Sequence, residues 1–380
     1  MRRFILLTAT LFACMIMVSA NTHMTNEQQV EKTRIQVAIL LDTSSSMDGL
    51  IEQAKSRLWN IVNTLTTLRY KGQTPQIEIA IYEYGNDQLA KRDSYIRQVT
   101  PLTTDLDLIS EKLFSLTTYG GLEYCGAVIN QAVSKLEWGN HSSDMKLVYI
   151  AGNEPFTQGD ISYKSAIDRA LGKDIYVHTI HCGDRQSGIS GMWRDGAIRG
   201  KGKFFNIDHN ARVRHYDTPY DDRISHCNER LNKTYIGYGS GWRSYQSNQV
   251  AQDANAAKIS SANMAERAVS KSSKMYDNST WDLVDMAKKD TKALSNIKKS
   301  ELPKEYQNKS TAELEKLVKE KDTERTAIQK EITELAQKRQ QYIDDQMKKD
   351  EGKASGDDLG KAINESILAL ANIKGYTNSK

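Results

Sequence analysis

An abrupt change from aliphatic to polar residues near position 42 constrains the fold of this chain more than any other feature. Val37 to Leu41 are all aliphatic, and Asp42, Ser44 and Ser46 follow directly. Such a run is typical of a strand that is buried on both faces of a parallel sheet. Ligands of parallel sheets lie just beyond the carboxyl ends of the strands, and a carboxylate with two hydroxyls offers the oxygen atoms that Mg²⁺ prefers. The stretch therefore predicts a cation site at the edge of a parallel sheet, followed by a helix over residues 50–68.

Apolar segments alternate with amphipathic ones as far as residue 208. We expect further strands at 76–84, 95–100, 146–151, 175–182 and 203–207, and helices at 106–116, 125–136, 162–171 and 189–198. The strand at 95–100 is expected to be the hairpin partner of the strand before it, at the edge of the sheet. Because strands and helices alternate, the sequence predicts a mostly parallel, doubly wound α/β sheet with helices on both faces.

The Asp-x-Ser-x-Ser motif of Asp42, Ser44 and Ser46, and the order of strands and helices around it, resemble the von Willebrand factor A (vWA) domain over residues 34–209. The resemblance implies a Rossmann-like fold in which the motif forms a metal-ion-dependent adhesion site (MIDAS). It implies Mg²⁺, or alternatively Mn²⁺ or Ca²⁺, as the cofactor. It also implies a non-enzymatic role in protein binding, in which an acidic residue of a partner protein completes the coordination of the cation.

Two positions depart from the pattern of that family. A Thr ligand usually follows the Gly-Gly pair, but here Gly120 and Gly121 precede Leu122 and Glu123. An Asp that holds the metal through water usually ends the fourth strand, where Gly152-Asn153 stands instead. We expect Glu123 to be the fourth metal ligand, and Asn153 and Glu154 to support the ligands from further out. The alternative is a degenerate site in a structural protein of the cell envelope that acts through its helical tail.

The first twenty residues have the features of a signal peptide. A charged start is followed by a mostly apolar segment over residues 4–18, and Val18-Ser19-Ala20 suits signal-peptidase cleavage. We therefore expect an exported protein, periplasmic or secreted, with residues 21–33 as a flexible lead-in. The alternative is a lipoprotein anchored at Cys14, because residues 11–14 look like a lipoprotein box. No later stretch is apolar enough to span a membrane.

Charge and motif content exclude several classes of function. Removal of Arg2 and Arg3 with the signal peptide lowers the formal net charge from +4 to +2, which does not indicate a nucleic-acid partner. The sequence contains no Gly-x-Ser-x-Gly nucleophile elbow and no phosphate-binding glycine loop followed by Lys-Ser/Thr. His178 and His181 are three apart in a predicted strand, so they point to opposite faces and cannot bind one ion. The sequence thus indicates neither an enzyme nor a nucleotide-binding protein.

Three cysteines remain after signal cleavage: Cys125, Cys182 and Cys227. Export permits a disulfide, and an odd count leaves one thiol over. Cys125 and Cys182 both lie at the carboxyl edge of the predicted sheet, so one expectation is a disulfide between them. The other is a pair of buried thiols. Cys227, in a predicted helix, is an alternative partner.

The composition changes past residue 210. Residues 210–243 form a connecting extension, in which Tyr235, Tyr238 and Trp242 are spaced among glycines. These aromatic side chains either pack the following segment against the first domain or form a recognition surface. Residues 244–380 are almost free of strand signals and predict an all-α tail.

The tail is expected to contain four helices, over residues 248–275, from Ser279-Asp282 to a point before Pro303, over 311–349, and from Ser355-Asp358 to Gly375. Ser310 and Glu313 form a capping box at the start of the long helix. The apolar residues of that helix are spaced by threes and fours in part, but Lys321, Arg325 and Arg339 interrupt the pattern. The pattern is compatible with self-association through a coiled coil and equally with packing in a helical bundle.

Overall fold

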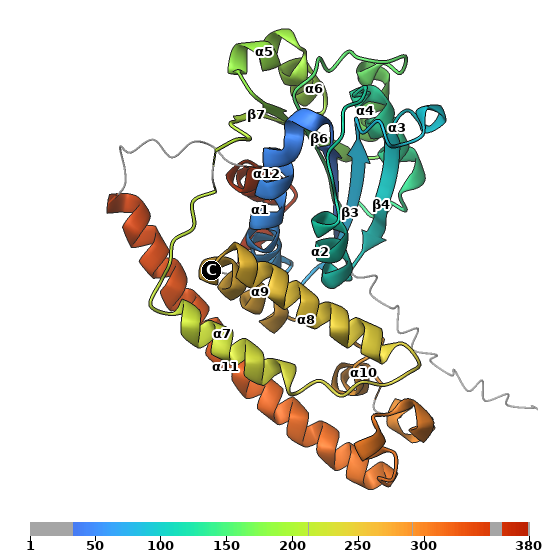
Figure 1. Ribbon diagram of the computed structural model, residues 1–380, viewed down its shortest axis with the longest axis vertical. Helices are drawn as coiled ribbons and strands as arrows, with labels where there is room; N and C mark the ends of the chain where they lie inside the picture. Colours follow the sequence, from blue (N-terminus) through green and yellow to red (C-terminus); the bar gives the residue numbers. More distant parts are fainter. Residues whose placement is uncertain (1–32, 212, 291, 350–358, 379–380) are drawn as a thin grey trace, which may run out of the picture. The chain divides into compact units, whose positions relative to one another are not determined.

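Strand β1 (Arg34–Asp42) lies in the middle of a six-stranded sheet with the order β4-β3-β1-β5-β6-β7. The computed structural model describes residues 33–211, 213–290, 292–349 and 359–378 (Figure 1). The other strands of this sheet are β3 (Gln76–Tyr84), β4 (Ile96–Thr103), β5 (Met145–Gly152), β6 (Ile175–Cys182) and β7 (Lys201–Ile207). Strand β1 pairs in parallel with β3 and β5, and β4 is antiparallel to β3 at the edge. The mostly parallel sheet and its edge hairpin are therefore confirmed.

Side chains of β1 alternate between two hydrophobic cores. Ile35, Val37, Ile39 and Leu41 belong to one core, and Ala38 and Leu40 to the other. The second core is covered by α3 (Cys125–Lys135), α4 (Tyr163–Gly172) and α6 (Trp193–Arg199). The first is covered by α1 (Asp48–Thr66) and α2 (Leu106–Phe114). Both faces are thus covered, which explains why β1 reads as a continuous apolar run.

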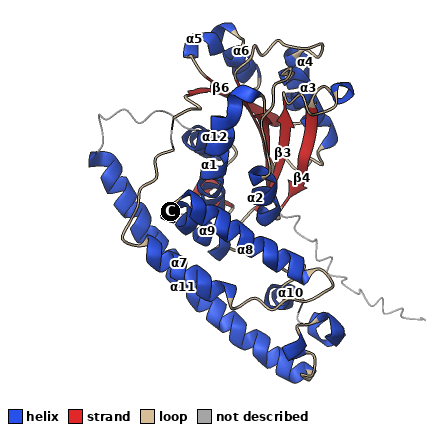
Figure 2. Cartoon of the chain, in the orientation of Figure 1, coloured by secondary structure: helices blue, strands red, loops and turns tan. Residues whose placement is uncertain are grey.

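The last helix, α12 (Leu359–Ile373), packs beside α1 on the first face of the sheet (Figures 1 and 2). Its Ile363 and Ile367 are fully buried in the core of that face. The hydroxyl oxygens of Ser366 and Tyr149 of β5 are 2.7 Å apart. After α12, strand β8 (Tyr376–Asn378) pairs antiparallel with β2 (Leu68–Tyr70), directly after α1. The far end of the chain therefore completes a core that begins at residue 35.

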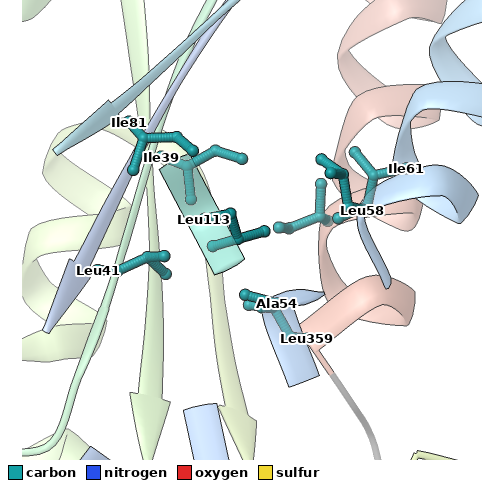
Figure 3. A pocket seen from close by; sticks show the side chains of 9 residues that line it. Ile39, Leu41, Ala54, Leu58, Ile61, Ile81, Leu113 and Leu359 are labelled. Carbon is teal, nitrogen blue, oxygen red and sulfur yellow. The ribbon is translucent and has the colours of Figure 1, made fainter. Parts of the chain in front are cut away.

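Helices α1, α2 and α12 meet over the sheet with almost no free space. The cavity that remains between them is about 20 Å³ and has an apolar lining (Figure 3). This volume is close to that of one water molecule, which would need polar partners that the lining does not offer. The lining residues come from β1, β3 and the three helices: Ile39, Leu41, Ile81, Ala54, Leu58, Ile61, Leu113, Leu359 and Ile363.

Between β7 and α12, the described part of the chain forms the α-helices α7 (Asp221–Asn232), α8 (Trp242–Ile259), α9 (Ser261–Ser272), α10 (Leu283–Lys289) and α11 (Thr311–Lys349). Helix α9 contacts α1, α7 and α8, and α8 contacts α2. Ile224 of α7 and Ala265 of α9 belong to the same core as β1. The domain boundary expected near residue 209 stays a prediction, but helices on both sides of it share one hydrophobic core.

Long helix α11 packs against α7, α9 and α10, as in a helical bundle. Its start carries the predicted capping box, since the Ser310 N–H donates to the Glu313 carboxylate at 2.7 Å and the Glu313 N–H to the Ser310 hydroxyl at 3.3 Å. Arg325 and Arg339, which interrupt the apolar pattern, are buried and form ion pairs, Arg325 with Asp282 at 2.7 Å. Self-association through this helix stays a prediction.

Four buried charges join helices α2, α8 and α9. Arg267 has no exposed surface and lies 2.6 Å from Asp107 and 2.9 Å from Asp253. Lys271, also fully buried, lies 2.9 Å from Asp253. The Arg267 guanidinium also lies over the rings of Trp59 and Tyr276, at 4.4 and 5.5 Å from the ring centres. The four formal charges cancel, so the cluster connects the helices without a net buried charge.

Two expected helices are each divided in the structure. The helix expected at 189–198 is two helices, α5 (Arg185–Ser190) and α6, separated at Met192, whose φ of +69° is left-handed. The helix expected at 248–275 is α8 and α9, separated at Ser260, which is extended and whose hydroxyl accepts from the Asn263 N–H to cap α9. The left-handed backbone at Met192 and the cap at Ser260 decide where these helices end and begin.

The aromatic residues of the 210–243 extension have the contacts of packing residues. Tyr235 is buried, with its ring 5.6 Å from that of Trp281 and 4.3 Å from the Arg325 guanidinium. The hydroxyl of Tyr238 donates to the Ser279 carbonyl. Trp242 is partly buried against the core of the first sheet face. These contacts favour the packing alternative over a recognition surface.

Several expectations fall on residues outside those described: the signal peptide, the lipoprotein cysteine Cys14 and the start of the last helix at Ser355-Asp358. Within residues 33–349 and 359–378, apart from the two single gaps, no helix is long and apolar enough to cross a membrane.

Candidate metal centre

The Asp-x-Ser-x-Ser motif lies where β1 ends. The Thr43 N–H still donates to the Tyr84 carbonyl of β3 at 2.9 Å, and the chain then enters a short 3-10 turn (Ser45–Met47) before α1. Asp42 is fully buried, and one of its carboxylate oxygens accepts from the Ser44 N–H at 2.7 Å. The hydroxyl oxygens of Ser44 and Ser46 are 3.3 Å apart. The motif therefore places one carboxylate and two hydroxyls together at the carboxyl edge of the sheet, as expected.

Glu123 reaches this point from the loop between α2 and α3. The loop is attached to the motif by the Tyr119 N–H, which donates to the Thr43 carbonyl at 3.0 Å. The Glu123 N–H donates to the Gln158 side chain at 2.5 Å. Only 4% of Glu123 is exposed, and its carboxyl group contacts the side chains of Asp42 and Ser44. The structure thus brings together the four expected ligands, with Ser46 at the exposed side.

The two carboxyl groups lack the partners that buried charges need. Asp42 Oδ2 and Glu123 Oε2 are both buried without a hydrogen-bond partner among the described residues. Burial raises the pKa of Asp42. The pKa of Glu123 is raised first by burial and then by its contact with Asp42. The nearby charge of Glu154 raises both, and no basic group is among the main influences on either. Two buried carboxylates in contact require a proton or a cation between them, so this donor set fits a divalent metal ion.

Two glycines make room for these carboxylates. A Cβ at Gly85, whose φ is +80°, would lie 2.7 Å from Cγ of Glu123 and 2.9 Å from Asp42 Oδ1. A Cβ at Gly152 would lie 2.5 Å from the Tyr84 hydroxyl and 3.0 Å from Asp42 Oδ2. An Asp could not replace Gly152 without displacing these groups. The role of Gly85 was not predicted from the sequence. Its position directly after the strand at 76–84, at the same edge of the sheet as Asp42, could have indicated it.

Asn153 and Glu154 follow β5 beside the motif. The Asn153 amide donates to the Ser46 hydroxyl at 3.2 Å, and its Oδ1 is buried without a partner. The Asn153 carbonyl lies 3.3 Å from Nε2 of His181, and Nδ1 of His181 lies 2.9 Å from Oδ1 of Asn206. Asn153 therefore supports Ser46, whereas Glu154 acts on the centre through its charge. His181 and Asn206, which hold Asn153 in place, were not found from the sequence.

The expected disulfide between Cys125 and Cys182 is wrong. Both thiols are free and buried, as is that of Cys227. Cys182 belongs to the core beneath α1, whereas Cys125 belongs to the core on the opposite face of the sheet. The sheet itself separates them, although both lie at its carboxyl edge. Burial accordingly raises the pKa of each thiol.

His178 and His181 point to opposite faces of β6, as their spacing predicts. His178 stacks on Tyr149 at 4.8 Å, and burial lowers its pKa to about 3. His181 packs on the other face against Trp193, with ring centres 5.8 Å apart. Among the described residues no group of three or more His, Cys, Asp or Glu side chains could hold a metal ion. A cation here would depend on two carboxylates and the serine hydroxyls.

One family model and several solved structures are similar to part of this chain. The family model of the von Willebrand factor type A domain matches residues 36–191. Among solved structures, BatB from Bacteroides thetaiotaomicron is 18% identical, with 46% of this chain and 90% of that chain covered at a TM-score of 0.35. The VWA domain of SpRpn10 is 15% identical, with coverages of 47% and 90% and a TM-score of 0.36.

A third structure, proximal thread matrix protein 1 from the mussel byssus with a zinc-occupied MIDAS motif, is 12% identical. The match covers 46% of this chain and 42% of the mussel protein chain, at a TM-score of 0.35. No curated protein sequence matches the chain. With the parallel sheet, the motif at the end of β1 and the family match in agreement, residues 36–191 of this chain form a vWA domain.

Proposed function

We propose that this chain is a non-enzymatic protein-binding protein of the cell envelope whose vWA domain depends on a divalent cation. The observation that carries the proposal is the pair of buried carboxyl groups of Asp42 and Glu123, which contact each other and each leave an oxygen unpaired. vWA domains are commonly interaction modules. The signal peptide expected over residues 1–20 supports an exported location, periplasmic or secreted, or a lipid anchor at Cys14.

Asp42, Ser44, Ser46 and Glu123 would hold Mg²⁺, or Mn²⁺ or Ca²⁺, through oxygen atoms. The cation would supply the positive charge that the two carboxylates lack, and would hold the loop of residues 115–124 against the end of β1. Ser46 is exposed, so this side of the centre is open to a partner protein. An acidic residue of that partner, as the resemblance implies, would have to compete with Glu123, which already contacts Asp42.

Calorimetric titration of the mature protein with Mg²⁺ and Mn²⁺ tests the cation. We expect saturable binding to the wild type that is lost in Asp42→Ala. Asp160→Ala is the matched control, because it removes an exposed carboxylate from a nearby loop. Partner capture in Mg²⁺ and in EDTA, with Asp42→Ala alongside, then tests protein binding. Absence of cation binding by the wild type contradicts the proposal.

The second candidate is a structural envelope protein with a degenerate metal site. Two observations favour it. Positions 152 and 153 carry no carboxylate, and helices α7, α8, α9, α11 and α12 contribute residues to the core of the sheet. Under this alternative the wild type and Asp42→Ala behave alike in Mg²⁺ and EDTA. Association with the envelope then persists in Asp42→Ala and in EDTA.

A further inference from the structure

We propose that Glu123 is a built-in ligand that occupies the coordination position which an acidic residue of a partner would otherwise take. This inference rests on the proposed cation site and says how that site is completed. It implies that the chain binds its cation without a partner, and that a partner at this edge need not present a carboxylate. The position of Glu123 and the hydrogen bonds of its loop both support this assignment.

The loop that carries Glu123 is attached to three neighbouring segments. The Tyr119 N–H donates to the Thr43 carbonyl at 3.0 Å, and the Gly120 carbonyl accepts from the Asp87 N–H at 2.7 Å. The Glu123 N–H donates to the Gln158 side chain at 2.5 Å. Hydrogen bonds at the glutamate itself and at the residues three and four positions before it therefore hold its backbone in one place. A residue held in this way is a preformed ligand rather than a side chain that swings in from solvent.

The carboxyl group of Glu123 also lies in a space shaped for it. Gly85 leaves open the volume that Cγ of Glu123 fills, because a Cβ there would come within 2.7 Å of that atom. Gly121 makes the same approach possible, since its own Cβ would lie 2.4 Å from the Gly85 carbonyl oxygen. Two glycines in contact thus bring this loop close enough to β3 for the glutamate to reach Asp42.

Glu123 is the one carboxylate among residues 115–124. The Thr118 hydroxyl donates to Asp48 at the start of α1, so it is engaged elsewhere. Leu122 is apolar and 44% exposed. Glu123 is the buried carboxylate of the loop, and its Oε2 and Oδ2 of Asp42 are the two unpaired carboxylate oxygens of the centre. A cation that pairs both oxygens is coordinated by the chain's own acids.

Chemical rescue of Mn²⁺ binding tests the inference. Loss of a residue that only supports a metal ligand typically weakens binding 10- to 100-fold, so we expect Glu123→Ala to lose about 100-fold or more in Mn²⁺ affinity. Excess acetate should restore much of that affinity, because the truncated side chain leaves room for a small carboxylate. The wild type should be insensitive to acetate. Glu154→Ala, which removes a nearby charge but no ligand, should change the affinity less than about tenfold.

Glu123→Gln keeps the shape of the side chain and serves if the alanine variant does not fold. It should bind Mn²⁺ more weakly than the wild type and should not respond to acetate, because the amide fills the space. Circular dichroism without metal checks the fold of each variant. Wild-type affinity in Glu123→Ala overturns the inference, and so does tighter Mn²⁺ binding to the wild type in acetate, which would reveal an open position. Failure of the wild type to bind Mn²⁺ at all refutes the cation site of the proposed function, and the inference with it.

Discussion

Replacement of Arg267 by Met should destabilise the protein far more than the same change at Arg230. Both arginines pair with a carboxylate at nearly the same distance, 2.6 Å from Arg267 to Asp107 and 2.7 Å from Arg230 to Glu331. Their surroundings differ. The side chain of Arg267 has no exposed surface, whereas those of Arg230 and Glu331 are 41% and 35% exposed.

The expected magnitudes follow from this difference in burial. Removing one member of a buried ion pair leaves an uncompensated charge in the interior and typically costs about 3–5 kcal/mol. Removing one member of an exposed pair typically costs about 0–1 kcal/mol, because water and salt already screen it. Met keeps much of the packing of Arg267 between the Trp59 and Tyr276 rings, so the loss of charge dominates. We therefore expect the two variants to differ by about 3 kcal/mol in free energy of unfolding.

Urea denaturation followed by circular dichroism measures the free energy of unfolding of the wild type and both variants. The double variant Arg267→Met with Asp107→Asn is the internal control. It removes the unpaired charge yet keeps an acceptor for the Tyr276 hydroxyl, which donates to Asp107 at 2.5 Å. We expect it to recover part of the loss. If Arg267→Met cost no more than Arg230→Met, the buried cluster would not stabilise the contact between α2, α8 and α9, and the reasoning would be refuted.

Three further predictions concern other parts of the fold. Burial lowers the pKa of His178 to about 3, so the unfolded chain takes up a proton that the folded protein does not, and stability should fall by about 2 kcal/mol between pH 7 and pH 5. Urea denaturation at both pH values should show this loss in the wild type and not in His178→Asn. Ile363→Ala in α12 should lower the free energy of unfolding by about 2–5 kcal/mol in the same assay, because Ile363 is fully buried. Ile373→Ala, at a position 75% exposed, should lower it by about 0.5 kcal/mol or less. Equal losses would contradict a core role for α12. Gly152→Ala should weaken Mn²⁺ binding in calorimetry because its Cβ would crowd the carboxylates, and Gly172→Ala, which has open space around it, should not.

Local sequence patterns were enough to predict most of the sheet and much of the candidate centre. The run at Val37–Leu41 predicts a strand buried on both faces, and the polar residues after it mark the carboxyl edge. Glu123 was expected near Asp42 because the resemblance to the vWA domain implies a metal ligand from the loop after Gly120-Gly121. The capping box at Ser310 and Glu313 was equally readable, since both residues lie within one turn of the helix.

Long-range packing could not be read in the same way. Cys125 and Cys182 share an edge of the sheet but not a face, and only the paths of their strand and helix decide the face. Arg325 interrupts the apolar pattern of its helix in the sequence. In the structure it is buried all the same, because partners on other elements, among them Asp282, pair with its charge. Gly85 and Gln158 are adjacent to Glu123 only after folding.

The sequence by itself determined most of the strands and helices of this chain, which side of each is apolar, and where the candidate ligands lie along the chain. Those properties depend on residues close by in the sequence, so the spacing of apolar and polar residues reveals them. The tertiary structure alone decided that α12 completes the core beneath α1, that Glu123 is enclosed beside Asp42, and that Arg267 is buried among four helices. An apolar or charged face of a helix or strand has to be covered in the folded protein. The local sequence does not reveal which distant segment covers it.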